Sequence, residues 1–161
     1  LKLFSESISK ESKKIHSNNI KLKFIGDTSL LTKALQIKIK EIEKETSRNK
    51  RLVLNVALNY GGRLDIVNSV NTFYNNKKRI KKITEKDINS GLYTKGQSDV
   101  DLLIRTGGQQ RMSNFLLWQS AYAELFFSKK LWPDFDEKIF VNALYFFQNT
   151  ERKFGSVSKS T

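Results

Sequence analysis

The stretch "RLVLNVALNY", residues 51–60, decides the fold class, because its apolar residues fall on both alternating faces of an extended strand. One face carries Leu52, Leu54, Val56 and Leu58, and the other carries Val53 and Ala57. A strand that is apolar on both faces is typical of a parallel sheet covered by helices. This stretch therefore predicts an α/β fold.

The segments before this strand agree with that class. The alternating run "IKLKFI" at residues 20–25 predicts a second strand, which Gly26 ends. Asp27, Thr28 or Ser29 can cap the helix that follows, and that helix is expected to end near Thr46. Its apolar stripe consists of Leu31, Leu35, Ile39 and Ile42. A looser helical stripe in residues 1–18 consists of Leu1, Phe4, Ile8 and Ile15.

The segments after it continue the alternation of strands and helices. Gly61 and Gly62 lead into a helix whose inner face holds Ile66, Val70 and Phe73, and Thr84 with Asp87 predicts a short capped helix. We expect a strand at 100–104, a helix and then a strand within 114–128, and a final helix over 136–153. The prediction is α/β with a mainly parallel sheet, one domain over residues 1–155 and a tail at 156–161.

Composition limits the function classes. The 161 residues are 39% hydrophobic and 28% charged, contain no cysteine and carry a net charge of +13. Disulfides and thiolate metal sites are therefore excluded, while nucleic acid, anionic lipid and phosphorylated small molecules are all attracted. Without a signal-peptide pattern or a long apolar run, a cytoplasmic location is expected. Residue 1 is Leu and the only methionine is Met112, so we expect that the protein continues upstream of this sequence.

The loop "IRTGGQQRMSNF", residues 104–115, is the strongest candidate site. Arg105 follows the strand at 100–104, and ligands of open α/β sheets bind beyond the carboxyl ends of strands. Gly107 and Gly108 are expected to curl the backbone into an anion nest, and Ser113 to open a helix whose N-terminus faces the same anion. With the guanidiniums of Arg105 and Arg111 the loop suits a diphosphate. A solvated loop with two extended arginines is the alternative.

Glu124 lies in the apolar run "AYAELFF". A carboxylate there must be ion-paired, hydrogen-bonded or metal-bound, because burying it bare is costly. A structural ion pair with an arginine is one interpretation. Mg²⁺ bridging the carboxylate and a diphosphate is the other.

Several motifs together resemble one family. "DLLIRTGGQQRMSNFLLWQSAYAELFF" followed by "LWPDF" closely resembles the C-terminal signature of the cis-prenyltransferases, specifically the bacterial undecaprenyl diphosphate synthases. "IGDTS" at 25–29 and "LNYGGRLDIV" at 58–67 match that family in the same order. The likeness runs from about residue 1 to Gly155.

The resemblance implies a Rossmann-like fold and a transferase that extends farnesyl diphosphate with isopentenyl diphosphate in cis geometry, making undecaprenyl diphosphate for the cell-wall lipid carrier. It implies that Arg105, Arg111 and Ser113, with Met112 between them, hold the diphosphate of isopentenyl diphosphate, and that Glu124 helps to bind Mg²⁺. Supporting roles fall to Asp101, Gly107, Gly108 and Gln109. The family works as a homodimer with an apolar product tunnel.

This chain departs from the family pattern in two respects. The "DGNGRWA"-type loop with its catalytic aspartate and the "FSxENW"-type segment with its asparagine are both missing, so this chain has no catalytic residue of the family. We therefore expect the C-terminal part of a synthase, which holds only the isopentenyl diphosphate half-site and is inactive by itself. Gln109 also stands where the family commonly has Glu.

Two other functions remain as alternatives. A non-catalytic or inactive prenyltransferase subunit is disfavoured by the retained arginines, Ser113 and Glu124. A nucleic-acid-binding module would use the basic run Lys77, Lys78, Arg79, Lys81 and Lys82, but aromatic residues do not alternate with it, so no nucleic-acid partner is predicted. Peripheral contact of the same run with an acidic membrane surface fits a lipid product better.

Overall fold

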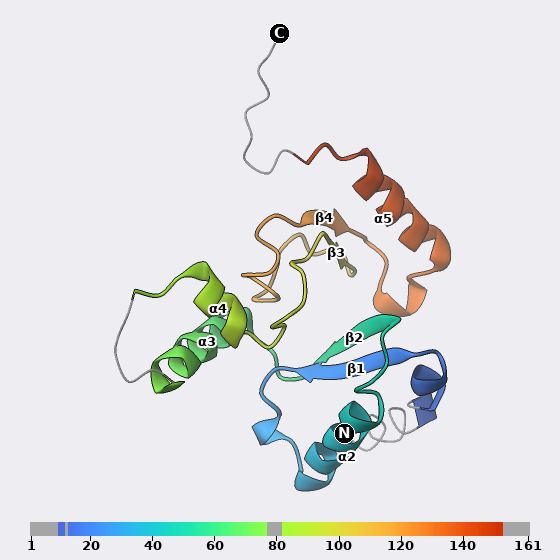
Figure 1. The fold of residues 1–161 in the computed structure, drawn as a ribbon. Coiled ribbons are helices and arrows are strands. Elements are labelled where there is room, and N and C mark those ends of the chain that lie inside the picture. The colour runs from blue at the N-terminus through green and yellow to red at the C-terminus, as the bar shows by residue number, and fades with distance from the viewer. Residues whose placement is uncertain (1–9, 12, 77–81, 153–161) are drawn as a thin grey trace. The chain divides into compact units, whose positions relative to one another are not determined.

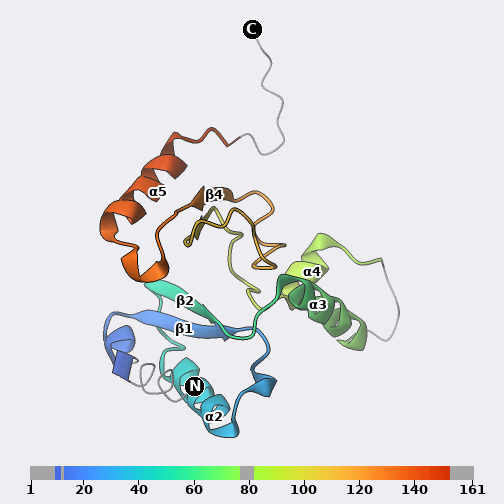
Figure 2. The same ribbon diagram turned by 180° about the vertical axis from the view of Figure 1, so that it is seen from behind.

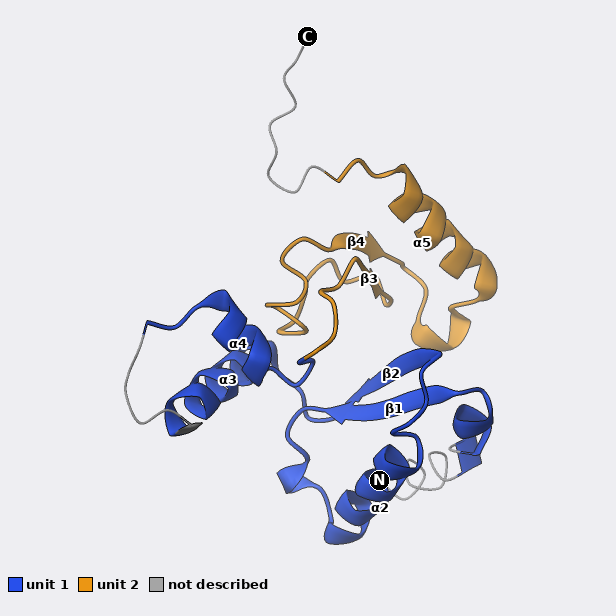
Figure 3. Cartoon of the chain, viewed as in Figure 1, with its two compact units in different colours: residues 1–95 blue, residues 96–161 orange. Residues whose placement is uncertain are grey.

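The chain forms two compact units, residues 1–95 and residues 96–161 (Figure 3). The computed structural model describes residues 10–11, 13–76 and 82–152 (Figure 1, and from behind in Figure 2). Three parts of the prediction therefore lie outside the described residues. They are Leu1, Phe4 and Ile8 of the first helical stripe, most of the basic run at 77–82, and the tail at 156–161.

The first unit is built on a parallel pair of strands. Strand β1 (Ile20–Ile25) pairs with β2 (Leu52–Ala57) in a register that runs from Ile20↔Leu52 to Ile25↔Ala57. The connection between them contains the 3₁₀ helix η1 (Thr28–Leu30) and the helix α2 (Lys33–Glu45). A strand, a helix and a parallel strand form the βαβ unit, as the sequence predicted for this region.

Helix α2 is fixed on β1 by both apolar and polar contacts. Leu35, Ile39 and Ile42 are buried, which confirms the predicted stripe for these three residues. The Leu22 N–H donates to the Thr46 hydroxyl at 3.1 Å, and the Phe24 N–H donates to Glu43 at 2.8 Å. These two N–H groups point away from β2, so side chains of α2 and its C-cap satisfy the outer edge of β1.

Strand β2 is less covered than its sequence predicts. Leu52, Val53 and Leu54 are 53%, 40% and 39% exposed. The expectation that apolar residues on both faces are buried is therefore wrong for the first half of β2 within this structure. The reason is that the apolar stripe of α2 packs on β1, whereas a strand is buried on both faces only where helices cover both.

Two packed helices complete the first unit. They are α3 (Gly62–Asn76) and α4 (Glu85–Gly91). The predicted capping box of Thr84 and Asp87 is present in full. Asp65 is only 1% exposed, and it accepts hydrogen bonds from the Tyr60 hydroxyl and the Tyr93 N–H, both at 2.9 Å. This buried carboxylate ties the start of α3 to the segment after α4.

The second unit also contains a parallel pair, with a helix beside it. Strand β3 (Leu102–Arg105) pairs with β4 (Glu124–Phe127), and the 3₁₀ helix η2 (Trp132–Asp134) leads into α5 (Glu137–Asn149). The rings of Phe126 and Phe146 lie 5.7 Å apart and join α5 to β4. The final helix was predicted over residues 136–153, and α5 begins one residue later, at Glu137, with Asp136 as its N-cap. It ends at Asn149, four residues before the predicted end.

The helix predicted at the start of 114–128 is wrong, because the structure has turns over residues 113–122. Ser113, Asn114 and Leu116 adopt φ angles of 48°, 63° and 44°. These left-handed conformations are incompatible with a right-handed helix, although the apolar content of the segment suits one.

Each unit has its own two-stranded parallel sheet, which confirms the α/β class with parallel strands flanked by helices. The single domain over residues 1–155 stays a prediction, as does the tail at 156–161. Within the described ranges, no helix is both long enough and apolar enough to cross a bilayer.

Candidate functional site

Arg105 is the centre of the candidate site, at the carboxyl end of β3. Its Nη1 lies 2.8 Å from the Ser113 hydroxyl oxygen and also donates to the backbone carbonyl of Arg111. The loop therefore folds back on the strand end, and the structure brings Arg105, Arg111 and Ser113 together. We call these three residues the arginine cradle.

A hollow of about 220 Å³ lies at the arginine cradle. It is lined by Leu103, Ile104, Arg105, Arg111, Met112, Ser113 and Phe115. Arg111 is exposed and Arg105 is partly buried, so a ligand can reach guanidinium donors from solvent. Guanidinium groups present planar, paired N–H donors that match phosphate oxygens. Apart from the three residues of the arginine cradle the lining is apolar, so the hollow suits a small molecule with one anionic end and one hydrocarbon end.

The two glycines of the loop have a different role from the one predicted. Gly107 and Gly108 have φ angles of 87° and 75°, as the predicted curl requires. Their N–H groups, however, donate to the carbonyls of Lys130 and Ser128 at 2.7 and 2.9 Å. The predicted anion nest at these glycines is therefore wrong, because the same N–H groups dock the loop on the segment after β4.

The predicted helix N-terminus at Ser113 is also absent, since turns follow this residue. The anion-binding capacity of the loop consequently comes from side chains. Ser113, Asn114 and Leu116 hold left-handed conformations that non-glycine residues rarely adopt. Such conformations often occur at functional sites, where neighbouring contacts hold them.

Glu124 lies at the other end of the β3–β4 pair. It is the first residue of β4 and pairs with Leu102, whereas Arg105 pairs with Phe127, three register steps away. Directly paired residues of a parallel sheet project from the same face, and faces alternate along a strand. Glu124 therefore shares a face with Phe126, and Arg105 lies on the opposite face. The structure does not bring Glu124 into the arginine cradle.

The position of Glu124 away from the arginine cradle decides whether the described residues can hold the expected Mg²⁺. In the part of the chain that the structure describes, no three His, Cys, Asp or Glu residues are grouped where they could hold a metal ion. Mg²⁺ is usually held by one or two carboxylates together with phosphate oxygens and water. One half-buried carboxylate away from the cradle does not form such a site, so the described residues alone do not fit the ion.

Sequence reasoning missed one residue of this unit, Arg152. It lies 51 positions from Asp101, yet its Nη1 donates to the Asp101 carboxylate at 2.6 Å. No local pattern connects two residues so far apart, and only the packing of α5 brings them together. Gln109 is exposed in the loop, and its supporting role stays a prediction.

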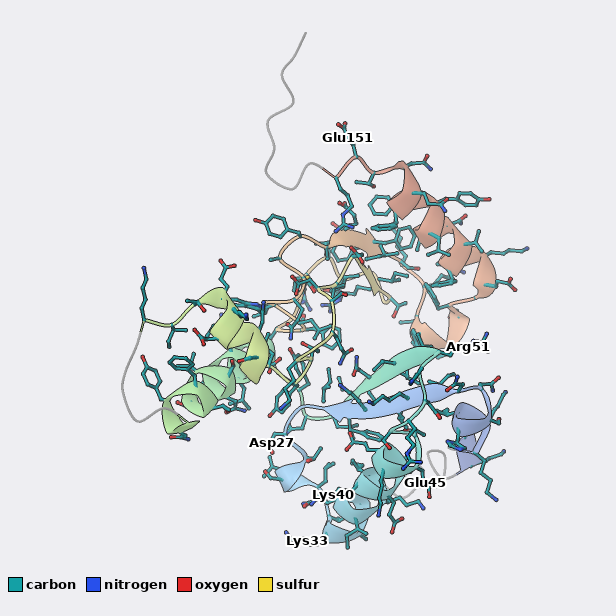
Figure 4. The ribbon with its side chains drawn as sticks, in the orientation of Figure 1. Asp27, Lys33, Lys40, Glu45, Arg51 and Glu151 are labelled. Carbon is teal, nitrogen blue, oxygen red and sulfur yellow. The ribbon has the colours of Figure 1, made fainter. Side chains whose placement is uncertain are left out.

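The first unit has a hollow of its own, of about 440 Å³, next to the end of β1. Asp27 lies on its rim, in the turn after β1, and Lys40 comes from α2 (Figure 4). Ser29 donates its hydroxyl and its N–H to Asp27 at 2.6 and 2.9 Å, and these bonds lower the pKa of that carboxyl group. Among the residues that the structure describes, no arginine lines this hollow. Its donors suit a phosphate less well than those of the arginine cradle.

The fold and the site define an α/β protein with an arginine-lined candidate site for a small anion at a strand's carboxyl end. Comparison with known proteins identifies the family. A family model described as putative undecaprenyl diphosphate synthase matches residues 1–155. The chain therefore belongs to the undecaprenyl diphosphate synthase family of prenyltransferases, which are transferases.

Named relatives agree with this family. The farnesyl-diphosphate-specific ditrans,polycis-undecaprenyl-diphosphate synthase of Pasteurella multocida is 47% identical, over 98% of this chain and 67% of its own length. The enzyme of the same name from Yersinia pseudotuberculosis is 45% identical, over 98% of this chain and 64% of its own length. The chain thus spans about two thirds of the relatives that it matches.

Solved structures agree with the fold. A probable undecaprenyl diphosphate synthase from Campylobacter jejuni superposes with a TM-score of 0.87 at 34% identity, covering 96% of this chain and 72% of its own. Lavandulyl diphosphate synthase from Lavandula x intermedia, in complex with dimethylallyl diphosphate, gives a TM-score of 0.90 at 32% identity, covering 96% and 69%.

Proposed function

We propose that this chain takes part in cis-prenyl chain elongation, in which isopentenyl diphosphate is condensed onto farnesyl diphosphate to give undecaprenyl diphosphate. Its own contribution is the site for the diphosphate of isopentenyl diphosphate. The observation that carries the proposal is the bond from Arg105 to Ser113, which gathers two arginines and a hydroxyl around one hollow.

The arginine cradle would act through binding and orientation. Arg105 and Arg111 offer charge-assisted hydrogen bonds to diphosphate oxygens, and the Ser113 hydroxyl adds one more donor. Leu103, Met112 and Phe115 provide an apolar surface for the five-carbon group. A substrate held at both ends presents its double bond in one direction, which lowers the entropic part of the barrier to condensation.

Mg²⁺ stays a prediction that rests on Glu124 and on the resemblance. When bound, the ion would neutralise diphosphate charge. None of the binding steps above depends on it.

Titration calorimetry tests the proposal. We expect isopentenyl diphosphate to bind the chain, and Arg105→Gln to weaken binding at least 10-fold, about 1.4 kcal/mol. Lys138→Gln is the matched control, because it removes one positive charge from the exposed first turn of α5. Equal binding by the chain and by Arg105→Gln would contradict the proposal, as would the absence of any heat.

We also propose that the protein is cytoplasmic and forms a homodimer. We propose further that it contacts the inner face of the membrane and serves synthesis of the lipid carrier for peptidoglycan. The support is a net charge of +13, which favours acidic lipid surfaces, and the exposed apolar residues Val141, Leu144 and Tyr145 on α5.

Sedimentation tests the dimer, and flotation with vesicles tests the membrane contact. We expect a dimer mass, together with salt-sensitive binding to anionic vesicles and none to neutral vesicles. A monomer would contradict the first proposal. Equal binding to both vesicle types, or preferential binding to duplex DNA, would contradict the second.

A further inference from the structure

Arg152 joins three segments of the second unit. It lies three residues beyond the end of α5, and its Nη1 lies 2.6 Å from the Asp101 carboxylate. Its Nη2 donates to the backbone carbonyl of Tyr122 at 3.3 Å, and its guanidinium lies 5.4 Å from the ring centroid of Phe147. We call Arg152, Asp101, Tyr122 and Phe147 the Arg152 clamp.

The Arg152 clamp surrounds the start of both strands. Asp101 directly precedes β3, and its carbonyl accepts the Glu124 N–H at 2.9 Å. Tyr122 lies two residues before Glu124 on the entry to β4. The clamp therefore holds the backbone two residues before Glu124 and also holds Asp101, whose carbonyl accepts the Glu124 N–H.

A contribution to the overall stability of the fold does not explain the contacts of the Arg152 clamp well. The Arg152 side chain is 20% exposed, but that of Asp101 is 65% exposed, and ion pairs in such wet surroundings contribute little to stability. A planar guanidinium with two bonds in fixed directions and an aromatic face instead specifies geometry. The contacts are better suited to fixing where a segment lies than to raising overall stability.

We propose that Arg152 is a positioning residue for Glu124. It holds the amino end of the β3–β4 pair independently of the arginine cradle, which lies at the carboxyl end. The proposal rests on the proposed function only through the predicted role of Glu124, whereas the contacts that hold Glu124 in place do not depend on that role. The two ends can therefore be perturbed separately.

Amide hydrogen exchange measured by NMR on the full chain tests this. In Arg152→Gln, we expect protection of the Glu124 amide to fall at least 10-fold. The Ser128 amide, which donates to the Arg105 carbonyl at 2.8 Å at the other end of the pair, should change less than 2-fold. Asp101→Asn should reproduce part of the effect, because it alters one of the three contacts of Arg152. The double variant should resemble Arg152→Gln alone, because the contact with Asp101 is already lost in that variant.

Two further variants refine the test. Arg152→Lys should give an intermediate loss, because lysine keeps the charge opposite Asp101 but lacks the second directed bond and the flat face. Lys138→Gln should leave Glu124 protection unchanged. Unchanged protection of Glu124 in Arg152→Gln would overturn the proposal, and so would an equal loss at Glu124 and Ser128, which would indicate a purely global effect.

Binding of isopentenyl diphosphate separates this proposal from the proposed function. We expect Arg152→Gln to bind within 2-fold of the unsubstituted chain, because the arginine cradle is held from the other end. Loss of binding in Arg152→Gln would overturn the independence of the two ends. Absence of binding in the unsubstituted chain would instead contradict the proposed function, while the exchange result would still decide the positioning role.

Discussion

The two parallel strand pairs of this chain end in opposite ways. At the end of β1, Gly26 turns tightly against the Leu58 carbonyl and Asp27 is bonded to Ser29, so the polar groups there stabilise the turn. At the end of β3, Arg105 keeps further guanidinium donors beside a hollow. The same strand-to-loop geometry thus gives a structural turn in one unit and a candidate anion site in the other, and the residues at the strand end make the difference.

The largest expected effect concerns the structural turn. A Cβ at Gly26 would lie 2.2 Å from the Leu58 carbonyl oxygen, and its φ is 110°. Gly26→Ala should lower the free energy of unfolding by about 3 kcal/mol, because strain and a backbone clash act together. Gly96→Ala is the control, since its φ of 75° is also left-handed but nothing lies within 4 Å of the added Cβ. Urea unfolding should give a loss of only about 1 kcal/mol there. Equal losses in the two variants would show that the clash is unimportant.

A smaller effect tests whether strain is held at the arginine cradle. Ser113→Ala and Ser113→Gly both remove the hydroxyl that bonds Arg105, and each should weaken isopentenyl diphosphate binding roughly 5-fold, about 1 kcal/mol. They differ in backbone freedom, because Ser113 has a φ of 48°. Ser113→Gly should be more stable than Ser113→Ala by about 0.5–1 kcal/mol in urea unfolding. Equal stability of the two variants would argue against strain at this position.

The smallest effect returns to the first unit. The hydrogen bonds from Ser29 lower the pKa of Asp27 below its usual 3.8. A carboxyl group with a lowered folded-state pKa adds stability above its unfolded pKa, and this is lost as the pH falls through the folded pKa. In thermal unfolding from about pH 6 to about pH 2.5, the unsubstituted chain should therefore be slightly more stable than Asp27→Asn at the higher pH. This difference in stability should begin to shrink as the pH falls below 3.8 and should be lost at the lower, folded-state pKa. The same gap between the two proteins at every pH would contradict this account.

Periodicity and capping predicted much of the fold. The correct predictions include the strand at 20–25 and a strand within 51–60, which the structure has as Leu52–Ala57. They also include the buried residues Leu35, Ile39 and Ile42 and the Thr84–Asp87 capping box. All of these depend on neighbours within a few positions, so the sequence displays them. The false helix within 114–128 has the same apolar content as a true one. It fails because left-handed backbone angles, held by contacts elsewhere, are not visible in a hydrophobic pattern.

The candidate site was predictable in part for a similar reason. Arg105, Arg111 and Ser113 lie within nine residues, so a short loop necessarily keeps them near one another. Three other features depend on strand register and on helix docking. The Gly107 and Gly108 N–H groups donate to residues 128–130, and Glu124 lies at the far end of the strand pair from Arg105. Asp101 pairs with Arg152. These are tertiary properties that local spacing does not encode.

The central claim is that the arginine cradle binds the diphosphate of an isoprenoid precursor. The most direct measurement is NMR of the arginine side-chain N–H signals during titration with isopentenyl diphosphate. We predict saturable shifts at Arg105 and Arg111, with the signal of Arg152 nearly unchanged. Saturable shifts confined to other arginines, or no shifts at Arg105 and Arg111 at saturating ligand, would contradict the account.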